Sequence, residues 1–92
     1  MSFTKESAVE RAKADLASRL DLSETEIAAS VADAEFSNMA MGASVDGELA
    51  AQMICNGWRL TLTAAGKDYE YRADRYNIRL VDFNGTNYII ES

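Results

Sequence analysis

Residues 56–72 read NGWRLTLTAAGKDYEYR, and this stretch decides the fold. Large apolar side chains alternate with polar ones on both sides of Ala65-Gly66, which is the period of a strand with one buried face. Gly66 can adopt the positive φ that a tight hairpin turn needs. The stretch therefore predicts a β-hairpin that the rest of the chain is built to cover.

The alternation also predicts the register of this hairpin. A turn centred between its two runs pairs Leu62 with Tyr69, so that aliphatic and aromatic side chains share a face. The same register sets Arg59 opposite Arg72, which is unfavourable unless Glu70 lies diagonally between them. A slip of one residue would turn the tyrosines towards solvent, so we exclude it.

The flanking segments predict an α+β fold, with one N-terminal helix packed on a four- to five-stranded, mostly antiparallel meander. We expect a helix over 4–20, a capped turn from Ser23 and strands over 28–36, 78–83 and 86–90. Residues 49–55 are expected to continue the Trp58 strand or to form a short lead-in strand, with Asn56-Gly57 as a bulge or turn. In the 78–83 strand, Val81 and Phe83 are predicted to lie on the face opposite Ile78 and Leu80.

Size and composition place the chain among small globular proteins. Its 92 residues, 48% hydrophobic and 26% charged, predict one domain spanning residues 1–92. A formal net charge of −6 disfavours binding to nucleic acids and to anionic membranes. The N-terminus has no apolar signal core and no run reaches transmembrane length, so we expect a cytoplasmic protein.

The chain offers little for catalysis. It contains no histidine and one cysteine, Cys55, which excludes an internal disulfide and the usual Ser-His and Cys-His pairs. No spacing suits a metal ion or a phosphate. We therefore predict no catalytic, cofactor-binding or metal-binding residues, and we expect Cys55 to be a small core residue.

Residues 37–48 form the long irregular segment, with Gly42 and Gly47 among small and polar residues. Loops of this length tend to be functional or disordered, and exposed methionines make adaptable contact surfaces. The alternative is that the methionines fold back over the sheet and that Trp58 is core. The candidate protein-binding residues are Asn38, Met39, Met41, Asp46 and Trp58.

The order of these segments resembles small bacterial domains of the PepSY-like type. The resemblance rests on ADLASRL at 14–20, GWRLTL at 57–62 and YEYRAD at 69–74. It implies a helix on an antiparallel sheet and a non-enzymatic binding or regulatory module, with some members acting on peptidases as inhibitors. The chain departs from the pattern at Phe36-Ser37, where Trp-Pro is expected, and at Gly42-Ala43, where Gly-Cys is common.

Two functions follow as hypotheses. The first is a protein-binding or regulatory module, with a peptidase among the candidate partners, that makes contact through residues 37–48. The second is a small structural subunit that forms a homodimer through residues 86–90, because this last strand is apolar on both faces.

Overall fold

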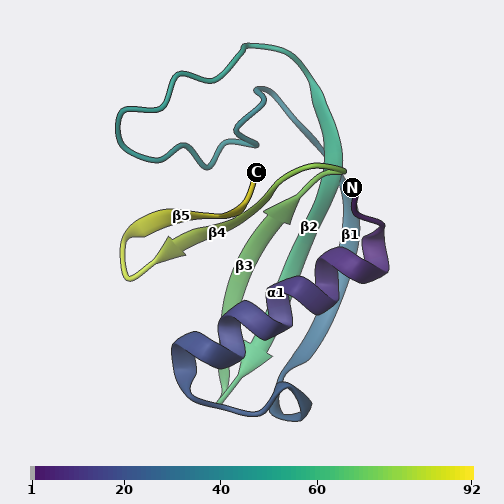
Figure 1. Ribbon diagram of the computed structural model, residues 1–92, viewed down its shortest axis with the longest axis vertical. Coiled ribbons are helices and arrows are strands. Elements are labelled where there is room, and N and C mark those ends of the chain that lie inside the picture. Colours follow the sequence, from purple (N-terminus) through teal and green to yellow (C-terminus); the bar gives the residue numbers. More distant parts are fainter. Residues whose placement is uncertain (1) are drawn as a thin grey trace.

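The computed structural model describes residues 2–92 and has one helical layer on one sheet (Figure 1). The sheet order is β1-β2-β3-β4-β5, and every neighbouring pair is antiparallel. The predicted α+β meander is therefore confirmed. The elements are α1 (Lys5–Leu20), η1 (Glu24–Glu26), β1 (Ala28–Phe36), β2 (Cys55–Ala64), β3 (Lys67–Ala73), β4 (Ile78–Phe83) and β5 (Thr86–Glu91).

The helix α1 crosses one face of the sheet and begins and ends where the sequence indicates (Figure 1). Thr4 is the N-cap, and its Oγ1 accepts a hydrogen bond from the Ser7 amide at 3.1 Å. Asp21 ends the helix in the left-handed region, with φ of 56°. Small side chains on the buried stripe let the helix approach the sheet closely, the buried helical residues being Ala8, Ala12, Leu16 and Ala17.

The central hairpin has the predicted register. Leu62 pairs with Tyr69 and Arg59 with Arg72. Glu70 relieves the arginine pair as expected, because its Oε2 lies 3.2 Å from Arg59 Nε and 2.6 Å from Arg72 Nε. The turn residues Ala65 and Gly66 both have positive φ, at 51° and 76°, which is the geometry of a type I′ hairpin turn.

One expectation about β2, that Asn56-Gly57 forms a bulge or a turn, was wrong. Asn56-Gly57 is neither a bulge nor a turn, because Gly57 lies in regular register opposite Ala34. A Cβ at this position would lie 2.2 Å from the Ala73 carbonyl oxygen. The glycine is therefore needed for the close approach of the end of β3.

Two further expectations were wrong. Residues 49–54 form no strand, and β2 begins only at Cys55. Phe83 lies with the helix-side core instead of the opposite face, and its ring centroid is 5.9 Å from that of Tyr69. The cause is a bulge at Asp82, which has a φ of 53° and lies where the pairing of β4 with β5 shifts. The extra residue moves the Phe83 side chain to the other face of the sheet.

The two faces of the sheet are covered differently. The helix side holds the main core, which includes Leu60, Tyr71 and Leu80. The other face carries a smaller buried cluster of Phe36, Met41 and Cys55, where residues 37–54 fold back over the sheet. Within residues 2–92, no helix is long and apolar enough to span a membrane.

Candidate functional site

The long loop between β1 and β2 spans residues 37–54 (Figure 1). It has two parts with different environments. We call residues 38–48 the anchored half, because side chains from the sheet bind its backbone. We call residues 49–54 the exposed half, because its large side chains project into solvent. Together they form the longest segment outside the helices and strands of the described chain.

Three side chains from β3, β4 and β5 bind carbonyl groups of the anchored half. Arg72 Nη1 donates to the Met41 carbonyl at 2.8 Å, and Arg79 Nη1 donates to that of Ala43 at 3.1 Å. Asn87 Nδ2 donates to the Ser44 carbonyl at 2.9 Å. These bonds tie the loop to strands that are distant in sequence.

An ion pair completes this attachment. Both terminal nitrogens of Arg79 donate to the carboxylate of Glu48, and the Arg79 side chain is only 5% exposed. The hydrogen bonds from Arg79 lower the pKa of Glu48 to about 2. Arg79 Nε has no hydrogen-bond partner within the described part of the chain, so the guanidinium depends on Glu48 and the loop carbonyl.

The anchored half is also organised from within. Asn38 Oδ1 accepts hydrogen bonds from the amides of Ala40 and Gly42, at 3.0 and 3.1 Å. This turn places the Met41 side chain in the cluster with Phe36 and Cys55, where it has no exposed surface. The sequence left two alternatives for Met41, an exposed contact residue or a side chain folded back over the sheet. Its burial agrees with the second alternative and removes Met41 from the candidate contact residues.

The exposed half presents three large apolar side chains to solvent. Leu49 is 99% exposed, Met53 63% and Ile54 65%. Met39 adds a further partly exposed side chain, and its amide donates to the Ala51 carbonyl at 2.9 Å. Three large apolar side chains exposed within residues 49–54 make this segment the candidate contact surface of the loop.

The other sequence candidates are dispersed. Asp46 is exposed at the turn before Gly47, which has a φ of 80°. Trp58 packs against the helix-side core and pairs with Asp33 of β1, away from the loop cluster. The structure therefore brings Asn38, Met39 and Asp46 into one loop and leaves Trp58 outside it.

The sequence reasoning missed the three exposed residues of the exposed half because it assigned residues 49–55 to a strand. A usable signal was present. Leu49, Met53 and Ile54 follow Gly47 without the alternation of a strand, and the intervening residues are two alanines and a glutamine. The missing alternation argues against a strand, but no local signal predicts that these apolar side chains are exposed.

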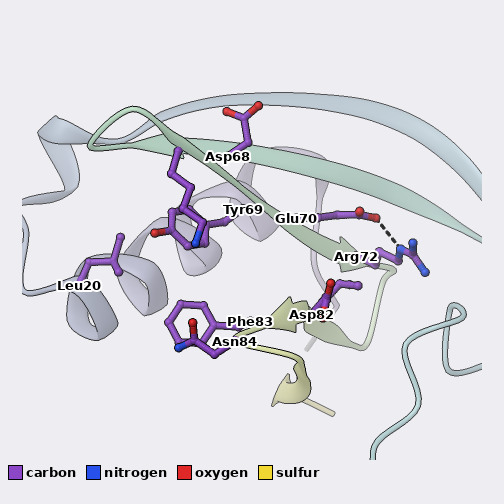
Figure 2. Close-up of a pocket in the computed structure, with 10 residues that line it drawn as sticks. Leu20, Asp68, Tyr69, Glu70, Arg72, Asp82, Phe83 and Asn84 are labelled. Carbon is purple, nitrogen blue, oxygen red and sulfur yellow. Dashed lines mark hydrogen bonds and ion pairs between the residues drawn. The ribbon is translucent and has the colours of Figure 1, made fainter.

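A cleft of about 530 Å³ lies between β3 and the end of β4. Figure 2 shows Tyr69 and Phe83 among the residues that line it, with Asp68 pointing away from their two rings. Its groups already have partners within the chain: Glu70 pairs with Arg72, and the Lys67 ammonium lies 5.5 Å from the Tyr69 ring centroid. We assign no ligand to this cleft.

Cys55 is the chain's one thiol and is buried at the start of β2. Its Sγ donates to Asp74 Oδ2 at 3.2 Å. Burial, with the adjacent carboxylate, raises the pKa of Cys55 to about 11, which keeps it a thiol at neutral pH. The expected core role of Cys55 is confirmed. Among residues 2–92, no group of three or more cysteine or acidic side chains is arranged to hold a metal ion.

Comparison with known proteins gives a family for this architecture. The profile described as "Domain of unknown function (DUF8738)" matches residues 9–81, which include most of α1, the loop and β1 to β3. The chain belongs to this family. No curated protein and no solved structure matches it. The match does not name the PepSY-like group, so that resemblance stays a prediction.

Proposed function

We propose that this protein is a non-enzymatic binding module that contacts a partner protein through the exposed half of its loop. One observation carries the proposal: Leu49, Met53 and Ile54 are all more than half exposed on a loop whose other half is bound to the sheet. Large apolar side chains that project from a surface act as anchors when a partner offers pockets for them.

The anchored half supports this function by holding the base of the contact surface in place. Binding by a flexible loop is weakened by the entropy lost when the loop becomes ordered. Arg72, Arg79 and Glu48 already order the residues that lead into the exposed half. The partner then has to order only a short segment, which favours affinity.

The class of partner is the finer part of the proposal. A projecting irregular segment with apolar side chains is a shape that the substrate groove of a peptidase accepts, so we propose a peptidase as the partner to test first. Inhibition would follow if the segment occupies that groove. We propose the cytoplasm as the compartment, whose reducing conditions are compatible with the free thiol of Cys55.

The test is affinity capture from an extract of the source organism, with a loop variant and a matched control. The loop variant carries Leu49→Ser, Met53→Ser and Ile54→Ser. The control carries Tyr88→Ser and Ile89→Ser, which remove partly exposed apolar side chains from β5. We expect a partner that the wild type and the control capture and the loop variant does not. Equal capture by all three proteins would contradict the proposal.

A second function, assembly through β5, is favoured by one observation. β5 is an outer strand of the sheet, and Tyr88 and Ile89 are 36% and 41% exposed. We therefore retain a homodimer formed through this strand as the alternative. Sedimentation tests it: a dimer that Ile89→Lys converts to a monomer supports assembly, and a wild-type monomer at high concentration excludes it.

A further inference from the structure

The exposed half of the loop begins directly after a residue that the sheet holds in place. Both terminal nitrogens of Arg79 donate to the Glu48 carboxylate, and the Glu48 amide donates to the Val45 carbonyl at 3.1 Å. The next residue, Leu49, is 99% exposed. Its side chain therefore projects into solvent from a fixed point on the chain.

The chain is held again two residues after Leu49. The Ala51 carbonyl accepts a hydrogen bond from the Met39 amide at 2.9 Å. The peptide bond between Leu49 and Ala50 therefore lies between two attached residues, whereas Met53 lies beyond both attachments. If the Leu49–Ala50 bond were broken, both new chain ends would stay attached to the body of the protein.

The backbone around this bond suits the active site of an endopeptidase. Residues 48–52 form no helix, strand or turn, and no residue from 48 to 54 has a positive φ. Within residues 49–54 only the small Ala50 is partly covered. An extended segment of this kind binds a groove through its backbone and places side chains in pockets.

The residue before the bond indicates the class of peptidase. Serine peptidases take this residue into a primary pocket, which is apolar in chymotrypsin and acidic in trypsin. Leu49 suits the apolar pocket, and its side chain makes no contact that it must give up on entry. Glu48, which would precede it in the groove, brings no unpaired charge because Arg79 binds it.

We propose that Leu49 enters the primary pocket of a serine endopeptidase that cleaves after large apolar side chains, and that the loop inhibits this peptidase. The inference rests on the proposed function and names the residue and the specificity behind it. The two attachments make the segment an inhibitor, because a peptidase that attacks the Leu49–Ala50 bond cannot release the products.

The chemistry of the attack is reversible for this reason. The peptidase serine forms an ester with the Leu49 carbonyl carbon, the bond to Ala50 breaks, and the serine proton passes through the peptidase histidine to the Ala50 amino group. Because the pairing of β1 with β2 and the two attachments keep this amino group beside the ester, it re-forms the peptide bond. The proton then returns to the serine.

The first experiment measures inhibition of chymotrypsin by the full-length protein. Its control is a linear peptide of residues 46–53, whose ends nothing holds. We expect reversible inhibition by the protein, with slow cleavage confined to the Leu49–Ala50 bond, and cleavage of the peptide about a hundredfold faster. A protein that is cleaved as fast as the peptide, or that chymotrypsin neither binds nor cleaves, would overturn the proposal.

A change of specificity tests the role of Leu49. Leu49→Lys should raise the Ki for chymotrypsin about a hundredfold and should create inhibition of trypsin, because lysine suits an acidic pocket. Met53→Lys places the same side chain beyond the attachments and should create no trypsin inhibition. Trypsin inhibition by neither variant, or by both equally, would overturn the assignment of Leu49.

The attachment at Ala51 is tested by removing one amide. Met39 is the second residue of a turn in which the Met41 amide donates to the Asn38 carbonyl at 3.0 Å, and such a position accepts proline. Met39→Pro should speed cleavage by chymotrypsin about tenfold relative to Met39→Ala, which keeps the amide. Thermal unfolding checks that both variants fold. Equal cleavage rates in two folded variants would show that the attachment does not protect the bond.

These outcomes are distinguishable from failure of the proposed function. Affinity capture of a partner that depends on residues 49–54, together with no inhibition of chymotrypsin, would leave the loop as a binding surface and overturn only the peptidase. Equal capture by wild type and loop variant, together with no inhibition, would overturn both.

Discussion

The two halves of the loop have opposite environments although their sequences offer similar side chains. Met41 in the anchored half has no exposed surface, whereas Met53 in the exposed half is 63% exposed. The difference comes from Arg72 and Arg79, which bind the carbonyl groups around Met41 from strands more than thirty residues away. Burial in this loop is therefore decided by tertiary partners, and local composition does not decide it.

Removing Glu48 should have the largest effect on the anchored half. Glu48→Ala leaves the buried Arg79 guanidinium without its carboxylate, and loss of one partner of a buried pair destabilises a protein by about 3–5 kcal/mol. Urea unfolding measures the change in the free energy of unfolding. The control is Asp46→Ala, two residues away on the exposed turn. It should change the free energy of unfolding by less than about 0.5 kcal/mol. Equal effects would show that Glu48 does not anchor the loop.

The two methionines allow the same substitution in both halves. Met41→Ser should destabilise the fold by about 3 kcal/mol, because it leaves a cavity and buries a hydroxyl group. Met53→Ser should change stability by less than about 0.5 kcal/mol, because the side chain is already largely in water. Thermal unfolding of the two variants side by side measures the contrast. A comparable loss in both would mean that the exposed half is also packed.

Acid should remove the contribution of the Glu48 ion pair. The folded-state pKa of Glu48, about 2, lies below its ordinary value of 4.5, so the stabilisation is present above pH 4.5 and is lost as the pH falls towards 2. Glu48→Gln cannot titrate. We expect the stability difference between wild type and this variant to shrink across that range, as urea unfolding at several pH values will show. A difference that stays constant would contradict the assigned pKa.

The smallest effect on stability is expected from Leu49→Ser. Leu49 is 99% exposed, so its removal should shift the free energy of unfolding by less than about 0.5 kcal/mol. Its effect on partner binding should be large, because truncation of an anchor typically lowers affinity by 2 kcal/mol or more, about thirtyfold in Kd. The melting temperature tests the expected effect on stability, and the Kd for the captured partner tests the expected effect on binding. Both are measured on one preparation.

The sequence was sufficient for the features that local rules control. The hairpin register followed from the alternation around Ala65-Gly66. The assignment of β1 needed a tertiary argument as well, because it combined the capped turn at Ser23 with the need of the hairpin for a neighbouring strand. Phe83 could not be placed, because its side depends on the left-handed backbone of Asp82, and aspartate adopts that conformation only in some contexts. Met41 and Leu49 could not be distinguished, because only the folded sheet brings arginines to one half of the loop.

Site-specific photo-crosslinking in the source organism tests the central claim most directly. A photoreactive phenylalanine analogue is placed at Leu49, at Met53, and, as controls, at Lys67 and Tyr88, all of which have exposed surface. We predict that positions 49 and 53 form an adduct with one partner protein and that positions 67 and 88 do not. An adduct at 88 but none at 49 and 53 would contradict the account and favour contact through β5.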